Sequence, residues 1–171
     1  MTDLFQYPMS YPGWWLSNYY YFTWTLAMLF LAGGWAFFYR YGKFSYGVDF
    51  GCFWKTALLV IMTTIALGGP SYYNTKFVAQ HGNDGDSVVL SPDRIEYRYR
   101  DGEKKMFLLK DIVSIYQEPV TYNPPPKIFI VAKNAGLRDS ITVTEGKYGL
   151  PDVDKLLSAL SERTGLPVKR P

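Results

Sequence analysis

The longest apolar stretch of the chain lies near its N-terminus. No charged residue occurs between Asp3 and Arg40, and residues 19–38 read YYYFTWTLAMLFLAGGWAFF. Twenty residues at the helical rise of about 1.5 Å span roughly 30 Å, the hydrocarbon thickness of a bilayer. Tyr and Trp residues gather at both ends of this stretch, where their rings suit the membrane–water interface. The pattern predicts a first transmembrane helix over residues 19–38.

A second apolar stretch follows after a short loop. Residues 50–69 read FGCFWKTALLVIMTTIALGG and are followed directly by Pro70, which we expect to end the helix. Lys55 lies about one and a half turns into the stretch, where its long stem can carry the charge to the headgroups. The sequence therefore predicts a transmembrane hairpin over residues 19–73. The alternative for the second stretch is an interfacial or half-buried helix.

Two polar or proline-containing segments flank the predicted hairpin. Residues 1–18 contain Pro8 and Pro12 among Tyr and Trp residues, which opposes a helix and favours headgroups. We expect an interfacial N-terminal arm, with packing on a partner subunit as the alternative. Residues 74–86 are polar and contain glycine, and they are expected to form a linker.

Beyond the linker the pattern changes to short strands joined by turns. Residues 94–100 (RIEYRYR) alternate charged with apolar or aromatic side chains, which is typical of a half-buried strand. Asp101-Gly102 predicts a two-residue hairpin turn, which pairs Arg100 with Glu103 and places Arg98 opposite Lys105. Strands are predicted at residues 87–90, 94–100, 103–109, 112–118, 127–133 and 140–145.

The chain closes with one amphipathic helix. Pro151 suits its first position, and Gly165 with Pro167 predicts its end. Apolar residues at i, i+3, i+4 and i+7 form one stripe: Val153, Leu156, Leu157 and Leu160. Since there is no room for helical crossovers, the sheet should be mostly antiparallel. The expected fold class is membrane-anchored α+β, with a transmembrane hairpin before a small β-barrel or bent sheet over residues 87–171.

This order of elements resembles the bacterial pleckstrin-homology-like (PH-like) membrane proteins. The resemblance rests on residues 88–95, on residues 107–115 (FLLKDIVSI), and on the two strands and the helix that follow. It implies a seven-strand PH-like barrel with a C-terminal helix, coupled to paired transmembrane helices. It also implies the inner membrane of a bacterium, with the barrel in the cytoplasm. The proline-rich loop at residues 119–126 departs from a compact barrel.

The distribution of charge separates the two halves of the chain. Residues 1–86 hold four basic and four acidic side chains, so the whole net charge of +3 lies in residues 87–171. A charge of this size does not indicate a nucleic-acid partner. Arg40 and Lys43 lie between the two predicted helices, and the positive-inside rule would place this loop in the cytoplasm. That orientation opposes the one implied by the resemblance, which we prefer.

Residues for catalysis or metal binding do not form a recognisable set. His81 is the one histidine and Cys52 the one cysteine, so neither has the partners that a metal site or a nucleophile pair needs. Asp84 and Asp86 flank Gly85, but the calcium-loop pattern is missing, and a solvated turn is the preferred interpretation. We expect no enzyme activity, no cofactor and no metal.

Two sets of residues are candidates for binding. Anionic lipid headgroups attract basic side chains near a membrane surface, and the predicted hairpin region carries Arg94, Arg98, Arg100, Lys104, Lys105 and Lys110. The alternative is a solvated face that nearby carboxylates partly neutralise. Small residues let helices approach closely, and the candidates for this role are Gly33, Gly34, Gly47 and Gly51.

These observations favour a non-catalytic, membrane-anchored scaffold or accessory subunit that binds other membrane protein subunits. The absence of a catalytic set, beside an anchor and a compact β domain, motivates this hypothesis. The first alternative is a PH-like module that binds anionic lipid headgroups. The second alternative is a structural component of an envelope or transport assembly.

Overall fold

The computed structural model describes residues 2–41, 50–119, 125–134 and 136–171. It divides into two compact units. The first unit, residues 13–78, contains two long helices, and the second combines residues 1–12 with residues 79–171. The second unit, called the α+β unit below, is therefore built from segments on both sides of the helix pair.

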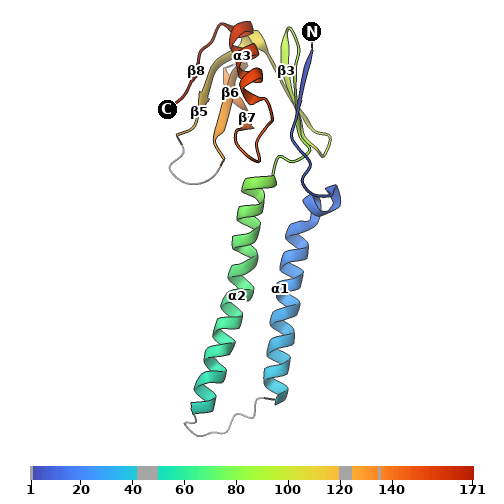
Figure 1. The fold of residues 1–171 in the computed structure, drawn as a ribbon, viewed down its shortest axis with the longest axis vertical. Helices are drawn as coiled ribbons and strands as arrows, with labels where there is room; N and C mark the ends of the chain where they lie inside the picture. The colour runs from blue at the N-terminus through green and yellow to red at the C-terminus, as the bar shows by residue number, and fades with distance from the viewer. Residues whose placement is uncertain (1, 42–49, 120–124, 135) are drawn as a thin grey trace. The chain divides into compact units, whose positions relative to one another are not determined.

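The helix pair is longer than the sequence pattern predicted. Its two helices lie side by side (Figure 1) and have these bounds: α1, Gly13–Tyr41, and α2, Phe50–His81. The expectation that Pro70 ends the second helix is wrong, because Pro70 lies inside α2. Proline removes only one backbone hydrogen bond, and the bonds on either side of it keep this long helix continuous.

Among the described residues, the segment Phe53–His81 of α2 is long and apolar enough to cross a membrane. This property follows from the length and composition of the segment. The transmembrane span over residues 19–38 stays a prediction at this point. Residues 42–49, which form the connection between the two helices and include Lys43 and Gly47, lie outside the described residues.

The first sheet of the α+β unit has the order β1-β2-β3-β4 and is antiparallel throughout. Its strands are β1 (Asp3–Gln6), β2 (Ser87–Leu90), β3 (Arg94–Arg98) and β4 (Lys104–Leu108). The expectation of an interfacial arm over residues 1–18 is wrong for β1, in which Phe5 pairs with Val88 and Gln6 with Ser87. Residues from Gly13 onward belong to α1.

The second sheet has the order β7-β6-β5-β8. Its strands are β5 (Ile112–Gln117), β6 (Lys127–Asn134), β7 (Leu137–Thr144) and β8 (Val168–Lys169). A single-turn 3-10 helix, Leu109–Asp111, connects the two sheets, and β8 is parallel to β5 while the other pairs are antiparallel. The long loop before β6 contains residues 120–124, which lie outside the described residues.

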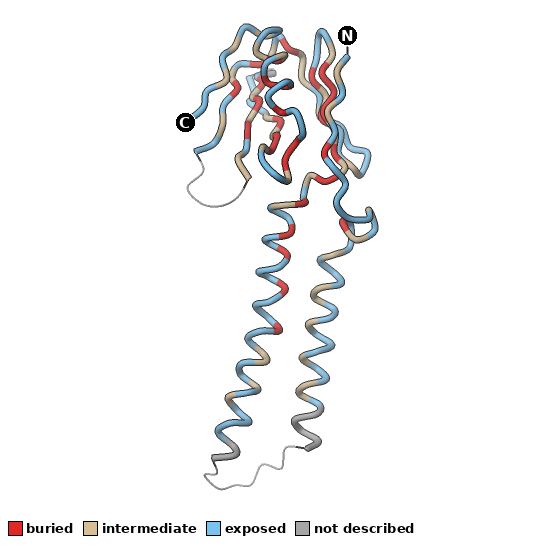
Figure 2. Tube along the Cα trace, in the orientation of Figure 1, coloured by how far each residue is buried: buried red, intermediate tan, exposed pale blue. Residues whose placement is uncertain are grey.

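Both sheets and the C-terminal helix share one apolar core. Helix α3 (Val153–Thr164) buries the predicted stripe of Val153, Leu156, Leu157 and Leu160. It begins two residues after Pro151, since Asp152 is in the left-handed conformation at the N-cap. Figure 2 shows the buried residues concentrated in the strands and α3, while the two long helices are mostly exposed. The predicted α+β class is confirmed.

Candidate functional site

A cluster of buried polar side chains lies in the α+β unit, around the loop that follows α2. His81, Asp84 and Asp86 are 7%, 1% and 5% exposed. The expectation of a solvated turn here is therefore wrong. The loop turns through Gly85, whose positive φ of 83° is the left-handed conformation that glycine adopts at little cost.

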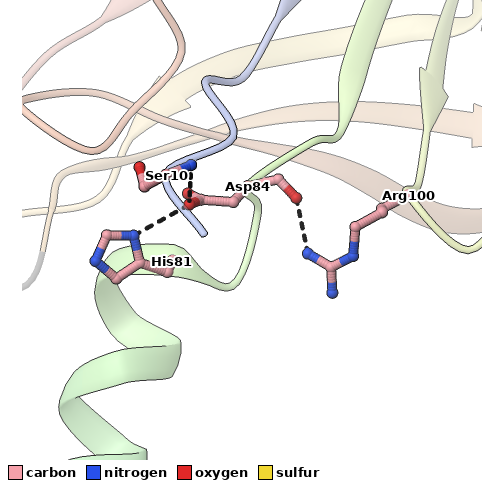
Figure 3. A network of polar contacts seen from close by, with 4 residues as sticks. All are labelled: Ser10, His81, Asp84 and Arg100. Carbon is pink, nitrogen blue, oxygen red and sulfur yellow. Dashed lines mark hydrogen bonds and ion pairs between the residues drawn. The ribbon is translucent and has the colours of Figure 1, made fainter. Parts of the chain in front are cut away.

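The carboxylate of Asp84 joins this loop to the N-terminal segment. It accepts a hydrogen bond from the backbone N–H of Ser10 at 3.1 Å and contacts His81 Nδ1 at 3.1 Å (Figure 3). The backbone carbonyl of Asp84 accepts a hydrogen bond from Arg100 Nη1 at 2.7 Å. The His81 ring also packs edge-on against Tyr11 and Tyr148. Three segments far apart in the sequence are thus held by one aspartate.

Asp86 forms the second half of the buried cluster. Its carboxylate accepts hydrogen bonds from Tyr97 Oη and from the backbone N–H of Arg100, both at 2.8 Å. Burial raises the pKa of Asp86, and the hydrogen bonds from Tyr97 and Arg100 partly oppose that rise. Burial also raises the pKa of Tyr97, so its hydroxyl keeps its proton and remains a donor. The hydrogen bonds of Asp86 therefore hold the start of β2 beside the end of β3.

Tyr7 connects the N-terminal segment to the far sheet. Its backbone N–H donates to Asp86 O at 2.9 Å, and its hydroxyl accepts a hydrogen bond from the backbone N–H of Thr144 at 2.9 Å. The side chain is 1% exposed, and burial raises the pKa of its hydroxyl. Tyr7 follows β1 of the first sheet and Thr144 ends β7 of the second, so this hydrogen bond connects the two sheets.

Sequence reasoning missed this buried cluster. The available signal was the Asp-Gly-Asp sequence of residues 84–86 placed directly before a strand, because aspartates in tight turns often accept backbone N–H bonds. The partners of these aspartates, Tyr7, Ser10 and Arg100, come from distant parts of the chain. Their pairing depends on tertiary structure, so no local pattern predicts it.

The predicted register of the basic hairpin is wrong by one residue. Arg98 lies opposite Lys104, and Tyr97 lies opposite Lys105. The cause is a longer turn than the two-residue one expected at Asp101-Gly102, since the backbone N–H of Tyr99 donates to Glu103 O at 2.9 Å. A slip of one residue moves side chains to the opposite face of the sheet.

This register divides the six candidate basic residues among separate places. Arg98 and Lys104 share an exposed face with Glu96, at 2.8 and 3.7 Å from its carboxylate. The hydrogen bond from Arg98 is the main reason that the pKa of Glu96 is lowered. Arg94 lies on the same face of β3, which we call the basic strand face and define as Arg94, Arg98 and Lys104.

The other three candidates lie elsewhere. Lys105 is on the opposite face of β4 and forms an ion pair of 2.6 Å with Asp139 of β7. Arg100 belongs to the buried cluster through Asp84. Lys110 is exposed in the 3-10 helix. The six residues therefore do not form one site, and Glu96 is the only carboxylate on β3 and β4.

The predicted packing glycines also differ from one another. A side chain at Gly34 would meet the end of the Met62 side chain, so Gly34 lies at the contact between the helices. Gly33 faces open space. Gly51 lies in α2, and Gly47 is outside the described residues.

An apolar groove of about 500 Å³ runs between the two helices. Its walls include Trp15, Phe22 and Leu26 of α1 and Ile65 and Tyr73 of α2. The indole N–H of Trp15 is buried and has no hydrogen-bond partner among the described residues. Within those residues, no group of three or more His, Cys, Asp or Glu side chains is placed to hold a metal ion.

These features define a class of protein: a helix pair with an apolar surface and a two-sheet α+β unit with a buried polar cluster. The chain enters the helix pair from the α+β unit and returns to that unit after α2. Comparison of the chain with protein-family models, curated proteins and solved structures found no match. Its function is accordingly inferred from its own residues.

Proposed function

We propose that this chain is a non-catalytic, membrane-anchored scaffold or accessory subunit that binds other membrane protein subunits. The observation that carries the proposal is the apolar surface of the helix pair. Large side chains point outward on both helices, with Tyr21 and Leu26 of α1 each 70% exposed and Trp54 of α2 69% exposed. Contiguous apolar surface of this kind is typical of contact with lipid or with another protein.

The pairing of β1 with β2 supports a two-span anchor. The first of these strands precedes α1, the second follows α2, and they are neighbours in one sheet. The start of α1 and the end of α2 must then lie on the same side of a membrane. If α2, which contains the span Phe53–His81, crosses the bilayer, α1 must cross it as well.

The order of strands in the α+β unit supports the PH-like assignment. Four antiparallel strands, β1 to β4, are followed by β5, β6 and β7 in a second sheet and then by α3. By that resemblance, the chain would lie in a bacterial inner membrane with the α+β unit in the cytoplasm. In this proposal the helix hairpin is inserted between the first and second strands of the PH-like domain.

The groove between the helices supports binding of a partner within the membrane. It is apolar, and small residues of both helices, Ala27, Ala66 and Gly69, contribute to its wall. Small residues allow the close helix approach on which association in lipid depends.

Native mass spectrometry of the full chain, extracted in mild detergent, tests the scaffold proposal. We expect a protein partner in fixed stoichiometry, and we expect Ala27→Trp, which fills the groove, to reduce its occupancy at least fivefold. Ala32→Trp is the matched control, since Ala32 is exposed on α1 and does not line the groove. A chain that carries no protein partner in either form contradicts the proposal.

The basic strand face favours a second candidate function, the binding of anionic lipid headgroups. Arg98 and Lys104 are directly opposite each other, which is unfavourable without a counter-charge, and Glu96 supplies only one. The same native spectra would report retained anionic lipid. Replacement of Arg94, Arg98 and Lys104 by Ser should reduce it, whereas replacement of the exposed residues Lys127, Lys147 and Lys155 by Ser should not.

A further inference from the structure

The edge of β5 that faces away from β6 is covered by the last residues of the chain over a short distance only. In β8, Val168 pairs with Ile115 and Lys169 with Tyr116, in parallel orientation. Strand β5 itself is longer, Ile112–Gln117. An uncovered sheet edge presents unpaired N–H and C=O groups, which are a template for another extended chain.

The segment that covers this edge binds as an added strand does. Leu166 and Val168, two residues apart, are both partly buried against the apolar core. Alternate side chains of an extended segment point to the same face, so these two apolar side chains enter the core while the backbone pairs with β5. Main-chain pairing with pockets for alternate side chains is the general mode of strand addition.

The segment is held by hydrogen bonds near its start and by one exposed ion pair near its end. Ser161 Oγ donates a hydrogen bond of 2.7 Å to Leu166 O. Arg170 forms an ion pair of 2.8 Å with Asp154, in which the two side chains are 51% and 75% exposed. Exposed ion pairs contribute about 0–1 kcal/mol, and isolated two-residue pairing adds little. The segment is therefore a weakly held occupant of the edge.

A cavity of about 590 Å³ lies between α3 and this segment. Leu157 gives its wall an apolar part, and Asp154 and Glu162 give it two carboxylates. The one basic side chain in the wall is Arg170, which the segment itself supplies. An occupant with alternate apolar residues and a basic end therefore matches the apolar part of the wall and its negative charge.

We propose that the β5 edge beside α3 is a docking groove for an extended, apolar and basic peptide segment of a partner protein. Residues 166–170 occupy the groove until the partner segment displaces them, pairs along the longer edge of β5 and brings its basic side chain to Asp154. This inference rests on the proposed scaffold function and names the surface on which the partner is bound.

A disulfide lock tests the displacement step on the full chain. Tyr116 and Lys169 are neighbours in the β5–β8 register and both are exposed, so Tyr116→Cys with Lys169→Cys, in a Cys52→Ser background, fixes the segment when oxidised. The probe is a fluorescent synthetic peptide with the sequence of residues 165–171, GLPVKRP, and its binding is measured by anisotropy. We expect the reduced protein to bind the peptide at least tenfold more tightly than the oxidised protein.

A release variant and a control peptide sharpen this measurement. The double substitution Val168→Ser with Arg170→Ser weakens the binding of residues 166–170 to the groove and changes no residue of β5 or α3. This variant should bind the peptide more tightly than the natural chain does. The control peptide GSPSKRP keeps the charges but lacks the two apolar side chains, and it should not bind. Equal binding by oxidised and reduced proteins, or equal binding of both peptides, overturns the proposal. Dimerisation of the natural chain through residues 166–170 of a second copy also overturns the partner assignment.

One measurement needs no substitution at all. The same peptide, with a photo-crosslinker in place of its valine, should label the natural chain in β5 or α3, and labelling elsewhere or none overturns the groove. The result is separable from the scaffold proposal. Loss of peptide binding while a protein partner still co-purifies rejects the groove alone, whereas peptide binding by a chain that has no partner in the membrane extract rejects the scaffold.

Discussion

The helix pair and the α+β unit place their large apolar side chains in opposite ways. In the α+β unit, Ile130 and Leu156 are fully buried, whereas in the helix pair Leu26 and Leu58 are 70% and 63% exposed. Burial of apolar area drives folding in water. The α+β unit therefore carries its own source of stability, whereas the helix pair leaves large apolar side chains exposed.

Polar groups show the same difference between the two regions. In the α+β unit, the buried carboxylates of Asp84 and Asp86 have donors within hydrogen-bond distance. In the helix pair, the described residues include buried donors with no partner, Trp24 Nε1 and Asn74 Nδ2 among them. Buried donors without acceptors cost free energy, so the described polar groups are better satisfied around Asp84 and Asp86 than at these positions of the helix pair.

The largest expected effect contrasts two leucines. Leu156→Ala in α3 should lower the free energy of unfolding by about 2–5 kcal/mol, because it opens a cavity in the core. Leu26→Ala in α1 removes the same atoms from an exposed position and should change it by less than about 0.5 kcal/mol. Hydrogen exchange of the β6 amides measures both. Equal losses in the two variants would remove the distinction between the regions.

Tyr7 tests whether the N-terminal segment belongs to the α+β unit. Tyr7→Phe removes the acceptor of the Thr144 N–H, and an unpaired buried donor costs about 1–3 kcal/mol. The control is Tyr116→Phe, at an exposed position of β5. Thermal unfolding of the full chain should show a clear loss for the first variant and almost none for the second. Similar behaviour of both would indicate that Tyr7 does not close the two sheets.

The fold of the α+β unit was largely predictable from residues 87–164. The alternating pattern of residues 94–98 and the apolar stripe of α3 both appear in the structure, because each depends on neighbours within a few residues. Strand β1 was not predictable, since its partner β2 lies some 80 residues away along the chain. Pro70 misled because proline removes only one helical hydrogen bond, and the residues on both sides of it continue the helix.

The candidate sites were less predictable than the fold. Composition located the basic residues, but a single residue of register decided that Lys105 faces Asp139 and that Lys104 faces Glu96. Turn length set that register, and the Asp-Gly pair predicted too short a turn. Residues 168–169 were invisible as a strand, because two residues carry no periodicity.

Asp86 adds a pH dependence to the comparison. Its pKa is raised above the ordinary value of 3.8 by burial, so the folded chain holds this proton more tightly than the unfolded chain. The stabilisation is complete below that ordinary value and is lost as pH rises through the raised pKa. The stability advantage of the natural chain over Asp86→Asn should therefore grow as pH is lowered toward 3.8, as measured by urea unfolding.

Asp139 supplies a control of opposite sign for this titration. The hydrogen bond from Lys105 lowers its pKa, so its contribution is present above the ordinary value and is lost as pH falls through the lowered pKa. The advantage of the natural chain over Asp139→Asn should shrink in acid. A parallel trend for Asp86→Asn and Asp139→Asn would mean that burial does not govern Asp86.

The smallest expected effect concerns the ion pair between Lys105 and Asp139, which connects β4 to β7 at 2.6 Å. The side chain of Asp139 is 60% exposed, so solvent screens the pair, and a double-mutant cycle with Lys105→Met and Asp139→Asn should give a coupling of about 0–1 kcal/mol. Raising the salt concentration should reduce it further. A coupling as large as the loss from Tyr7→Phe would mean that the surface ion pair stabilises the contact between the sheets as much as Tyr7 does. A small coupling would mean that Tyr7 contributes more than the ion pair to holding the sheets together. The two sheets would then depend on the N-terminal segment that precedes α1.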